Sequence, residues 1–153
     1  METPATGRSK RQTSYEFYKK LFKLTIGGGV EFWAITIVFS LLPIAAEFRA
    51  ALSISYISGA LVEPLFGGLI IGFCLSYILL RFFNKIPTKN TILKSVILSF
   101  VALFIVLILV QVAASRTSDA LNVFLIGAVF NLLRFPFVGI VIGYLYKRLY
   151  VSA

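Results

Sequence analysis

The feature that most constrains the fold is a run of 21 residues, 95–115, that holds no charged residue, no glycine and no proline. A helix of about 20 apolar residues crosses a hydrocarbon core about 30 Å thick. Three further apolar stretches lie between basic or polar flanks, so the sequence predicts transmembrane helices at about 24–46, 59–82, 94–115 and 120–146. Composition agrees: 59% of residues are apolar and 14% charged, against roughly 45–50% and 25% in soluble domains. We therefore expect an all-α, polytopic membrane bundle of four transmembrane helices.

The residue inventory excludes several kinds of chemistry. The chain contains no histidine, which removes the usual general base and the commonest metal and haem ligand. Its single cysteine, Cys74, cannot form an internal disulfide, and only six residues are acidic. No nucleotide-binding or hydrolase motif is present in its required context. We expect no catalytic residue, no metal, no cofactor and no enzymatic activity.

The net charge of +9 is distributed unevenly about the expected spans. Twelve lysines and arginines lie before the first span, between the second and third, or after the fourth. Only Arg49 and Arg116 lie on the opposite side, and Arg134 falls inside a span. Basic residues concentrate in cytoplasmic loops, so we expect both termini in the cytoplasm and a multi-pass protein of the cell membrane. The expected partner of these charges is a bilayer with anionic headgroups at the cytoplasmic face, and not nucleic acid.

The N-terminal region is expected to have two parts ahead of a transmembrane domain at 24–150. Residues 1–12 are polar and basic, which predicts a disordered cytoplasmic tail. Residues 13–23 begin with Thr13 and Glu16 at capping-box spacing and continue with apolar and basic residues on opposite sides. This pattern predicts a short interfacial amphipathic helix. The alternative is a cytoplasmic extension of the first span.

The second and fourth spans share a glycine pattern when the chain is offset by 71 positions. Gly68 and Gly72 then fall on Gly139 and Gly143, and two neighbouring apolar residues are also identical. Small residues four apart let helix backbones approach closely in lipid, so we expect packing through these faces, within one chain or between copies. The first and third spans match poorly at this offset. A duplicated helical hairpin is one interpretation, and ordinary bundle packing is the other.

Charges inside the spans mark candidate sites for an ion or a substrate. Glu63 and Arg134 are equivalent at the same offset, and a charge at mid-membrane needs a partner, so we expect them to form an ion pair. Pro136 would free a helix carbonyl near Asn131, which makes a binding site one interpretation and a packing kink the other. If Pro64 starts the second helix, Glu63 instead lies at the outer interface.

Glu31 is the third intramembrane charge, and it follows three consecutive glycines. A glutamate within the membrane can carry a proton or bind a cation. It could equally join Glu63 and Arg134 in a structural triad.

These features favour a small transporter or channel-like subunit with Glu31 as its intramembrane carboxylate. The alternative is a non-catalytic membrane subunit or assembly factor of a larger complex, favoured by the small packing faces and short loops. An enzyme acting on lipid is disfavoured, because no nucleophile or acidic cluster lies at the interface. In either case we expect a homo-oligomer or a membrane-protein partner.

The expected topology can be tested by cysteine labelling in sealed cells. In a background without Cys74, Lys10→Cys, Lys89→Cys and Ser152→Cys should each be protected from a membrane-impermeant thiol reagent, because the twelve-to-two charge bias places all three inside. Labelling of any one of them from outside would overturn the arrangement.

Overall fold

The computed structural model describes residues 4–151, with side chains from residue 12 onward. Within residues 4–151 the chain forms helices and connections and no strand. The α-helices are α1 (Pro4–Ser40), α2 (Pro43–Ala51), α3 (Glu63–Phe82), α4 (Thr91–Ala114) and α5 (Ala120–Tyr146). Three short helices of other types flank them: η1 (Ile57–Val62) and η3 (Lys147–Val151) are π-helices, and η2 (Phe83–Lys85) is a 3₁₀-helix.

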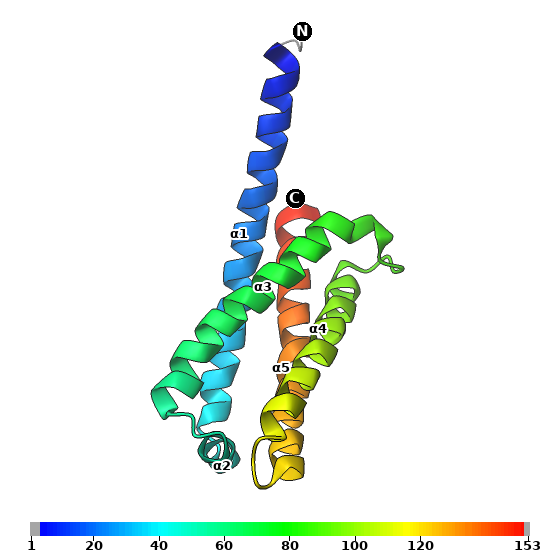
Figure 1. Ribbon diagram of the computed structural model, residues 1–153. Helices are drawn as coiled ribbons and strands as arrows, with labels where there is room; N and C mark the ends of the chain where they lie inside the picture. The colour runs from blue at the N-terminus through cyan, green and yellow to red at the C-terminus, as the bar shows by residue number, and fades with distance from the viewer. Residues whose placement is uncertain (1–3, 152–153) are drawn as a thin grey trace.

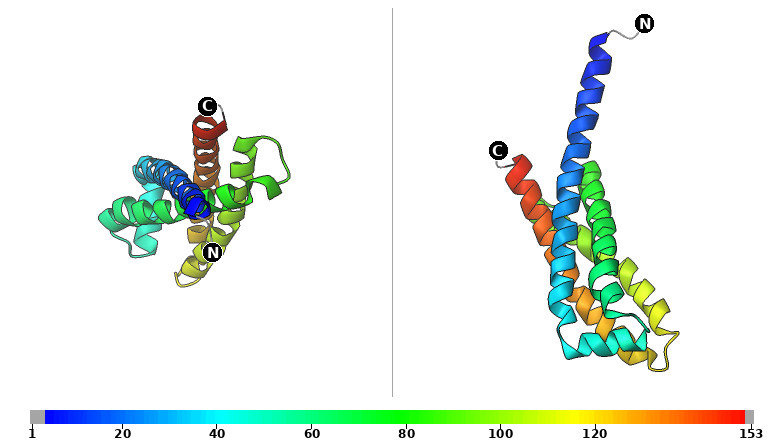
Figure 2. Two further views of the ribbon diagram at one scale, coloured as in Figure 1. Left: turned by 90° about the horizontal axis from the view of Figure 1, so that it is seen from above. Right: turned by 90° about the vertical axis from the view of Figure 1, so that its left-hand side faces the viewer.

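Four of the helices form a bundle in which successive long helices run in opposite directions (Figure 1). Helix α2 lies across one end of this bundle, beside the α4–α5 connection, and the C-terminus and the α3–α4 connection lie at the other (Figure 2). The four segments long and apolar enough to cross a membrane are Gln12–Ser40, Ile57–Lys85, Thr91–Ala114 and Ala120–Val151. The predicted all-α bundle is confirmed, and its four spans fit a multi-pass membrane protein.

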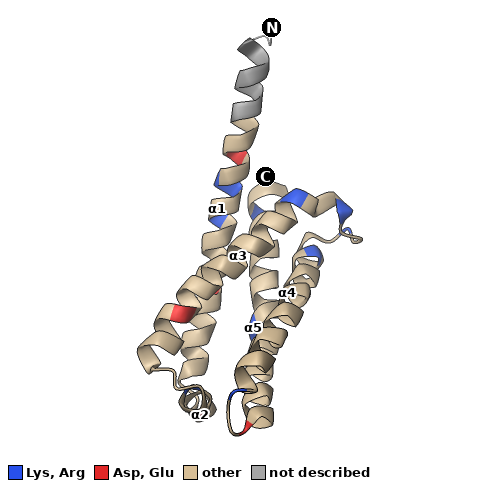
Figure 3. Cartoon of the chain, viewed as in Figure 1, with Lys and Arg blue, Asp and Glu red and all other residues tan. Residues whose placement is uncertain are grey.

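Lysine and arginine residues gather at the end of the bundle that holds the C-terminus and the α3–α4 connection (Figure 3). The long helices between the two ends carry few charges, as their high hydropathy requires. This segregation follows the twelve-to-two distribution in the sequence, because the alternating helices bring the three basic segments to one end.

In the N-terminal region the structure has the second of the two alternatives, in which segment 13–23 extends the first span. Residues 1–3 lie outside the described part, but α1 is continuous from Pro4 to Ser40 and so includes most of segment 1–12 and all of segment 13–23. The interfacial helix and the first span are therefore one helix. The glycines at 27–29 do not interrupt it, because they face neighbouring helices at close range.

The first span also ends earlier than its predicted limit at residue 46. Leu42 has an extended backbone, with φ −76° and ψ 139°, and Pro43 begins α2. A proline disfavours helical geometry in the residue before it but fits the first turn of a helix, so Pro43 ends one helix and starts another. Residues predicted to complete the first span instead turn across the bundle end.

The buried core lies where the four long helices meet. Its buried members are Phe32, Leu75, Leu79, Leu103, Phe135, Val138 and Ile142. Helix α4 contributes least, since only 11% of its most apolar window is buried inside the chain. Its remaining apolar surface faces outward, where a bilayer would cover it.

Helices α1 and α3 meet through glycine. A Cβ atom added at Gly72 would lie 2.8 Å from the carbonyl oxygen of Thr25 and 3.1 Å from the amide nitrogen of Gly29. One added at Gly68 would lie 2.9 Å from the carbonyl oxygen of Gly29. The two backbones are thus too close for any side chain at these positions, as expected for a small-residue face in lipid.

Helices α4 and α5 meet in the same way. A Cβ atom added at Gly139 would lie 2.6 Å from Ser99 Oγ and 2.9 Å from Val96 Cα. One added at Gly143 would lie 2.7 Å from Ile92 Cα. Each glycine pair therefore packs against the long helix that precedes it, within the chain.

The packing repeats between the two halves, but with two different offsets. Gly72 and Gly143 are 71 positions apart, whereas the residues they contact, Thr25 and Ile92, are 67 apart. The second half therefore has four more residues, about one helical turn, between its contacting positions. The two halves therefore share a mode of packing with a shifted register, and a duplicated hairpin stays a prediction.

The glycine contacts predict a sharp difference between neighbouring positions of α3. Gly72→Ala should lower the free energy of unfolding by about 1–3 kcal/mol, because its Cβ meets backbone atoms that cannot yield without separating α1 and α3. Gly67→Ala is the matched control, since its Cβ meets nothing within 4 Å. Reversible unfolding in mixed detergent measures both, and equal losses would show that α1 and α3 do not meet through Gly72.

Candidate functional site

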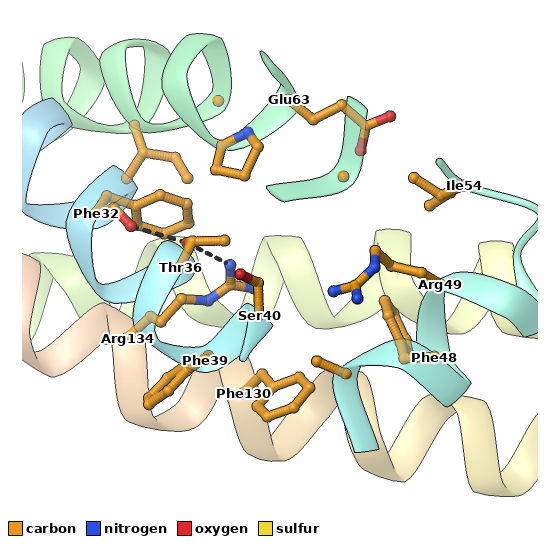
Figure 4. A pocket seen from close by; sticks show the side chains of 15 residues that line it. Phe32, Thr36, Phe39, Ser40, Phe48, Arg49, Ile54, Glu63, Phe130 and Arg134 are labelled. Atoms are coloured by element: carbon orange, nitrogen blue, oxygen red, sulfur yellow. Dashed lines mark hydrogen bonds between the residues drawn. The ribbon is translucent and has the colours of Figure 1, made fainter. Parts of the chain in front are cut away.

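A pocket with a volume of about 240 Å³ lies between α1, α2, α3 and α5, near the bundle end that α2 crosses (Figure 4). Four phenylalanines give it an apolar wall: Phe32, Phe39, Phe48 and Phe130. Its polar lining residues are Thr36, Ser40, Arg49, Glu63 and Arg134. An aromatic cavity with a few converging polar groups is the usual character of a ligand site.

Arg134 enters the pocket from the middle of α5 and is held on three sides. Its Nη1 donates to Thr36 Oγ1 at 2.9 Å, and its Nη2 donates to Asn131 Oδ1 at 2.9 Å. The guanidinium carbon lies 4.9 Å from the centroid of the Phe32 ring. The Nε atom is buried without a hydrogen-bond partner in the described part of the chain. All the groups that hold the cation are thus neutral.

The two hydrogen-bond acceptors of Arg134 are themselves oriented by helix carbonyls. Thr36 Oγ1 donates its proton to the Phe32 carbonyl at 2.8 Å, which leaves its lone pairs for the arginine. Asn131 Nδ2 donates to the Gly127 carbonyl at 2.8 Å, which turns Oδ1 toward Arg134. Each acceptor is therefore fixed before the arginine binds it. The predicted association of Asn131 with Arg134 is present, one turn apart on α5.

Arg49 is the second cation of the pocket, and α2 carries it there. Phe48 packs where Gly127 leaves space, since a Cβ at Gly127 would lie 3.0 Å from the Phe48 ring. The stem of Arg49 passes Gly59, whose added Cβ would lie 3.1 Å from its Cδ. The Arg49 guanidinium lies 5.1 Å from the centroid of the Tyr56 ring. Small residues on α5 and η1 thus make room for α2 and its arginine.

The predicted ion pair between Glu63 and Arg134 is not formed. Both residues line the pocket, but among the described residues no carboxylate oxygen lies within 4.0 Å of the Arg134 guanidinium. Glu63 is exposed, and its Oε1 accepts a hydrogen bond from Ser58 Oγ at 3.3 Å. The reason is local: α3 begins at Glu63 and Pro64, so the carboxylate sits at a helix start and turns toward η1.

Glu31 lies apart from this pocket. It is not among the lining residues, and it follows Gly28 by three positions, on the side of α1 that faces Ile142 of α5. Both of its carboxylate oxygens are buried and have no hydrogen-bond partner among the described residues. A triad with Glu63 and Arg134 is therefore not assembled.

The π-helix η1 forms one wall of the pocket and is tied to α1 by the only tryptophan of the chain. Trp33 Nε1 donates to the carbonyl of Leu61 at 3.1 Å. The indole thereby satisfies a carbonyl of the segment that precedes α3.

Sequence reasoning missed three of the polar lining residues. Arg49 was taken only as a charge on the loop side, although Pro43 is a typical first residue of a helix and could have indicated α2. Thr36 and Ser40 are hydroxyl residues within an apolar span, and each hydrogen-bonds to its own helix, so nothing in the pattern distinguishes them from structural residues.

No protein family, curated protein or solved structure matches the chain. Among the described residues, no three His, Cys, Asp or Glu side chains are grouped so as to hold a metal ion. The fold and the site together define a four-helix protein with spans of membrane length and a pocket that contains two arginines and one glutamate.

The contacts of Arg134 predict which substitutions depend on each other. Thr36→Val and Arg134→Gln should show a coupling of about 0.5–3 kcal/mol in a double-mutant cycle of unfolding free energy, because the two side chains are hydrogen-bonded.

Glu63→Gln combined with Arg134→Gln is the contrasting cycle. These losses should add to within about 0.5 kcal/mol, because no ion pair joins the residues. Strong coupling of Arg134 to Glu63 and none to Thr36 would contradict the arrangement described here.

Proposed function

We propose that this chain is a small, non-enzymatic integral membrane transporter or channel-like subunit, and that the pocket around Arg134 is its binding site. The single observation that carries this proposal is the position of Arg134. It lies within a predicted span, yet its guanidinium reaches into a cavity instead of pairing with an acid. A charge in such a span costs at least about 2.5–3.5 kcal/mol on insertion scales, and charges of this kind commonly mark ion or substrate pathways.

The lining of the pocket supports a binding role. Polar side chains of α1, α2 and α5 converge on the cavity, and phenylalanine rings surround them. The wall is unfilled next to Gly67, where an added Cβ would meet nothing within 4 Å. A small solute therefore has room to enter without displacing a helix.

The proposed orientation has both termini in the cytoplasm of a cell-membrane protein. The basic end of the bundle would then face anionic headgroups of the cytoplasmic leaflet. Helix α2 and the pocket would lie toward the outer face. A solute would reach Arg134 from outside.

Glu31 is proposed as a second, separate ionisable site. Its buried carboxyl has no hydrogen-bond partner within the described chain. It faces α5 and lies between the pocket and the basic end of the bundle. A proton or a cation carried there would couple movement of the bundle to an ion gradient. This role predicts that Glu31 serves activity and not assembly.

A second candidate function is a non-catalytic subunit of a larger membrane complex. Helix α4 favours it, because its outward surface is a continuous row of large apolar side chains, including Phe104, Ile105 and Ile108. Such a surface suits either lipid or another apolar helix, in a second copy or a different protein. Under this proposal the pocket would be a structural cavity.

Flux measurements separate the two candidates. The protein is reconstituted in proteoliposomes, and currents are recorded on a solid-supported membrane during jumps in pH and in the concentration of inorganic salts and organic acids. We expect a current that falls about tenfold or more in Arg134→Gln, because a lost charge-assisted contact is worth about 1.5–3 kcal/mol. Glu31→Gln should fold normally and lose only the response to pH or cation gradients.

Arg116→Gln is the matched control, since it removes a charge at the same bundle end but outside the pocket. Its current should equal that of the unchanged protein. Folded, inserted protein that gives no current in any gradient would reject transport and favour the subunit function.

A further inference from the structure

Two cations share the pocket without an anion between them. Arg49 and Arg134 direct their guanidinium groups into the cavity from opposite sides, on either side of Ser40 (Figure 4). Like charges that face each other across an apolar cavity repel more strongly than they do in water. The arrangement therefore favours a ligand whose charge is negative.

The acidic residue of the pocket does not supply that charge. The Glu63 carboxylate is exposed, accepts a hydrogen bond from Ser58 and lies on the opposite wall, turned toward η1. Neither arginine is within ion-pair distance of a carboxylate in the described part of the chain. Even with Glu63 ionised, the three charged side chains sum to one positive charge.

Both guanidiniums also keep unused donors. Arg134 spends Nη1 on Thr36 and Nη2 on Asn131, but its buried Nε has no acceptor. The guanidinium of Arg49 makes no hydrogen bond to a described residue and lies over the face of Tyr56. Guanidinium donors bind carboxylate and phosphate oxygens strongly and with defined geometry. The missing acceptor is an oxyanion.

The rest of the lining indicates the body of the ligand. Phe39 and Phe130 stack with ring centroids 5.6 Å apart on the side of α1 and α5, and Phe48 closes the α2 side. A volume of about 240 Å³ admits a small molecule and not a large one. Aromatic walls favour an apolar group over a fully hydrated inorganic ion.

We propose that the pocket binds an organic oxyanion, a carboxylate or phosphate attached to an apolar group, with the anion held between Arg49 and Arg134. This inference rests on the proposed function and deepens it, because it states the class of the solute. The same chemistry belongs to a free organic acid and to the phosphate of a lipid. In both cases Arg49 and Arg134 bind the oxygens, and the phenylalanines contact the apolar group.

Binding is tested separately from transport, with the full chain in phosphatidylcholine nanodiscs. Benzoate is the probe, and benzamide is its uncharged counterpart of the same shape. Ligand that binds only the folded state stabilises it by RT ln(1 + [L]/Kd), so the unfolding temperature rises with ligand concentration and its dependence on concentration gives Kd. We expect benzoate to raise this temperature as that relation requires and benzamide to leave it unchanged.

Four variants locate the site. Arg49→Gln and Arg134→Gln should each raise the Kd for benzoate about 10- to 100-fold, the range for loss of one hydrogen bond to a charged group. Gly67→Leu fills the unoccupied space beside α3 and should abolish the benzoate response while leaving both arginines in place. Arg116→Gln should leave the Kd unchanged.

A second arm distinguishes a lipid phosphate from a free acid. Nanodiscs that contain phosphatidic acid should weaken the benzoate response of the unchanged protein if a lipid phosphate occupies the pocket. A response equal to that in phosphatidylcholine assigns the pocket to a free organic anion. Both results support an oxyanion site, since both require the two arginines.

The proposal is overturned if benzamide matches benzoate, or if Arg49→Gln and Arg134→Gln both retain the original Kd. Its failure differs from that of the proposed function. Benzoate binding without any current would keep the oxyanion site and reject transport. A current that needs Arg134 but carries inorganic cations alone, with no benzoate binding, would keep transport and reject the oxyanion site.

Discussion

Contact between helix backbones at glycine is the interaction on which the rest of this structure depends. Lipid tails are as apolar as the helices, so burial from lipid gives little reason for these helices to associate. Close approach instead increases dispersion contact between backbone atoms. Gly72 meets the backbone of α1 and Gly143 meets the backbone of α4, which joins each half of the bundle internally. Gly27 and Gly28 of α1 in turn leave room for Leu145 and Ile142 of α5, and Thr36 reaches Arg134 across the same pair of helices.

The position of α2 follows from the connection in the first half. Thr25 and Gly72, which meet in the first half, are four positions closer in sequence than Ile92 and Gly143 in the second half. The chain between Thr25 and Gly72 nevertheless includes α2, which crosses the bundle end. Helix α2 and η1 lie at the end of α1 and α3. Helix α2 carries Arg49 into the pocket that Arg134 also lines. The two halves share their packing, but within the described residues only the first has a helix that crosses the bundle end, and α5 of the second half completes the pocket there with Arg134.

Much of the fold could be predicted from the sequence because lipid imposes a simple rule on helix length and charge. The spans and the glycine faces follow from that rule. The continuity of α1 does not, because glycine permits a break and only the close packing of α3 and α5 against Gly27, Gly28 and Gly29 decides against one. The end of the first helix was predicted too late, since Ala45 and Ala46 are apolar enough to continue a span while Pro43 redirects them.

The site was harder to predict, because two residues that correspond at the 71-residue offset need not lie close together in the fold. Glu63 and Arg134 correspond at the 71-residue offset, but one begins a helix and the other lies in the middle of one. Pro136 indicates Asn131 in the sequence, because it would free a helix carbonyl nearby, and the structure shows Asn131 bound to Arg134 one turn away. No local sequence pattern predicts that Arg49 lines the pocket, because its position depends on how α2 folds back across the bundle end.

The hydrogen bond from Trp33 to Leu61 has a consequence for how the pocket is observed in solution. It joins α1 to the segment that forms one wall, in surroundings with few competing polar groups. Movement of η1 away from α1 would break this bond and change the polarity around the indole. Since the chain has one tryptophan, its emission spectrum is an intrinsic signal from that wall, free of overlapping contributions. Opening and closing can therefore be followed optically, without attaching a label.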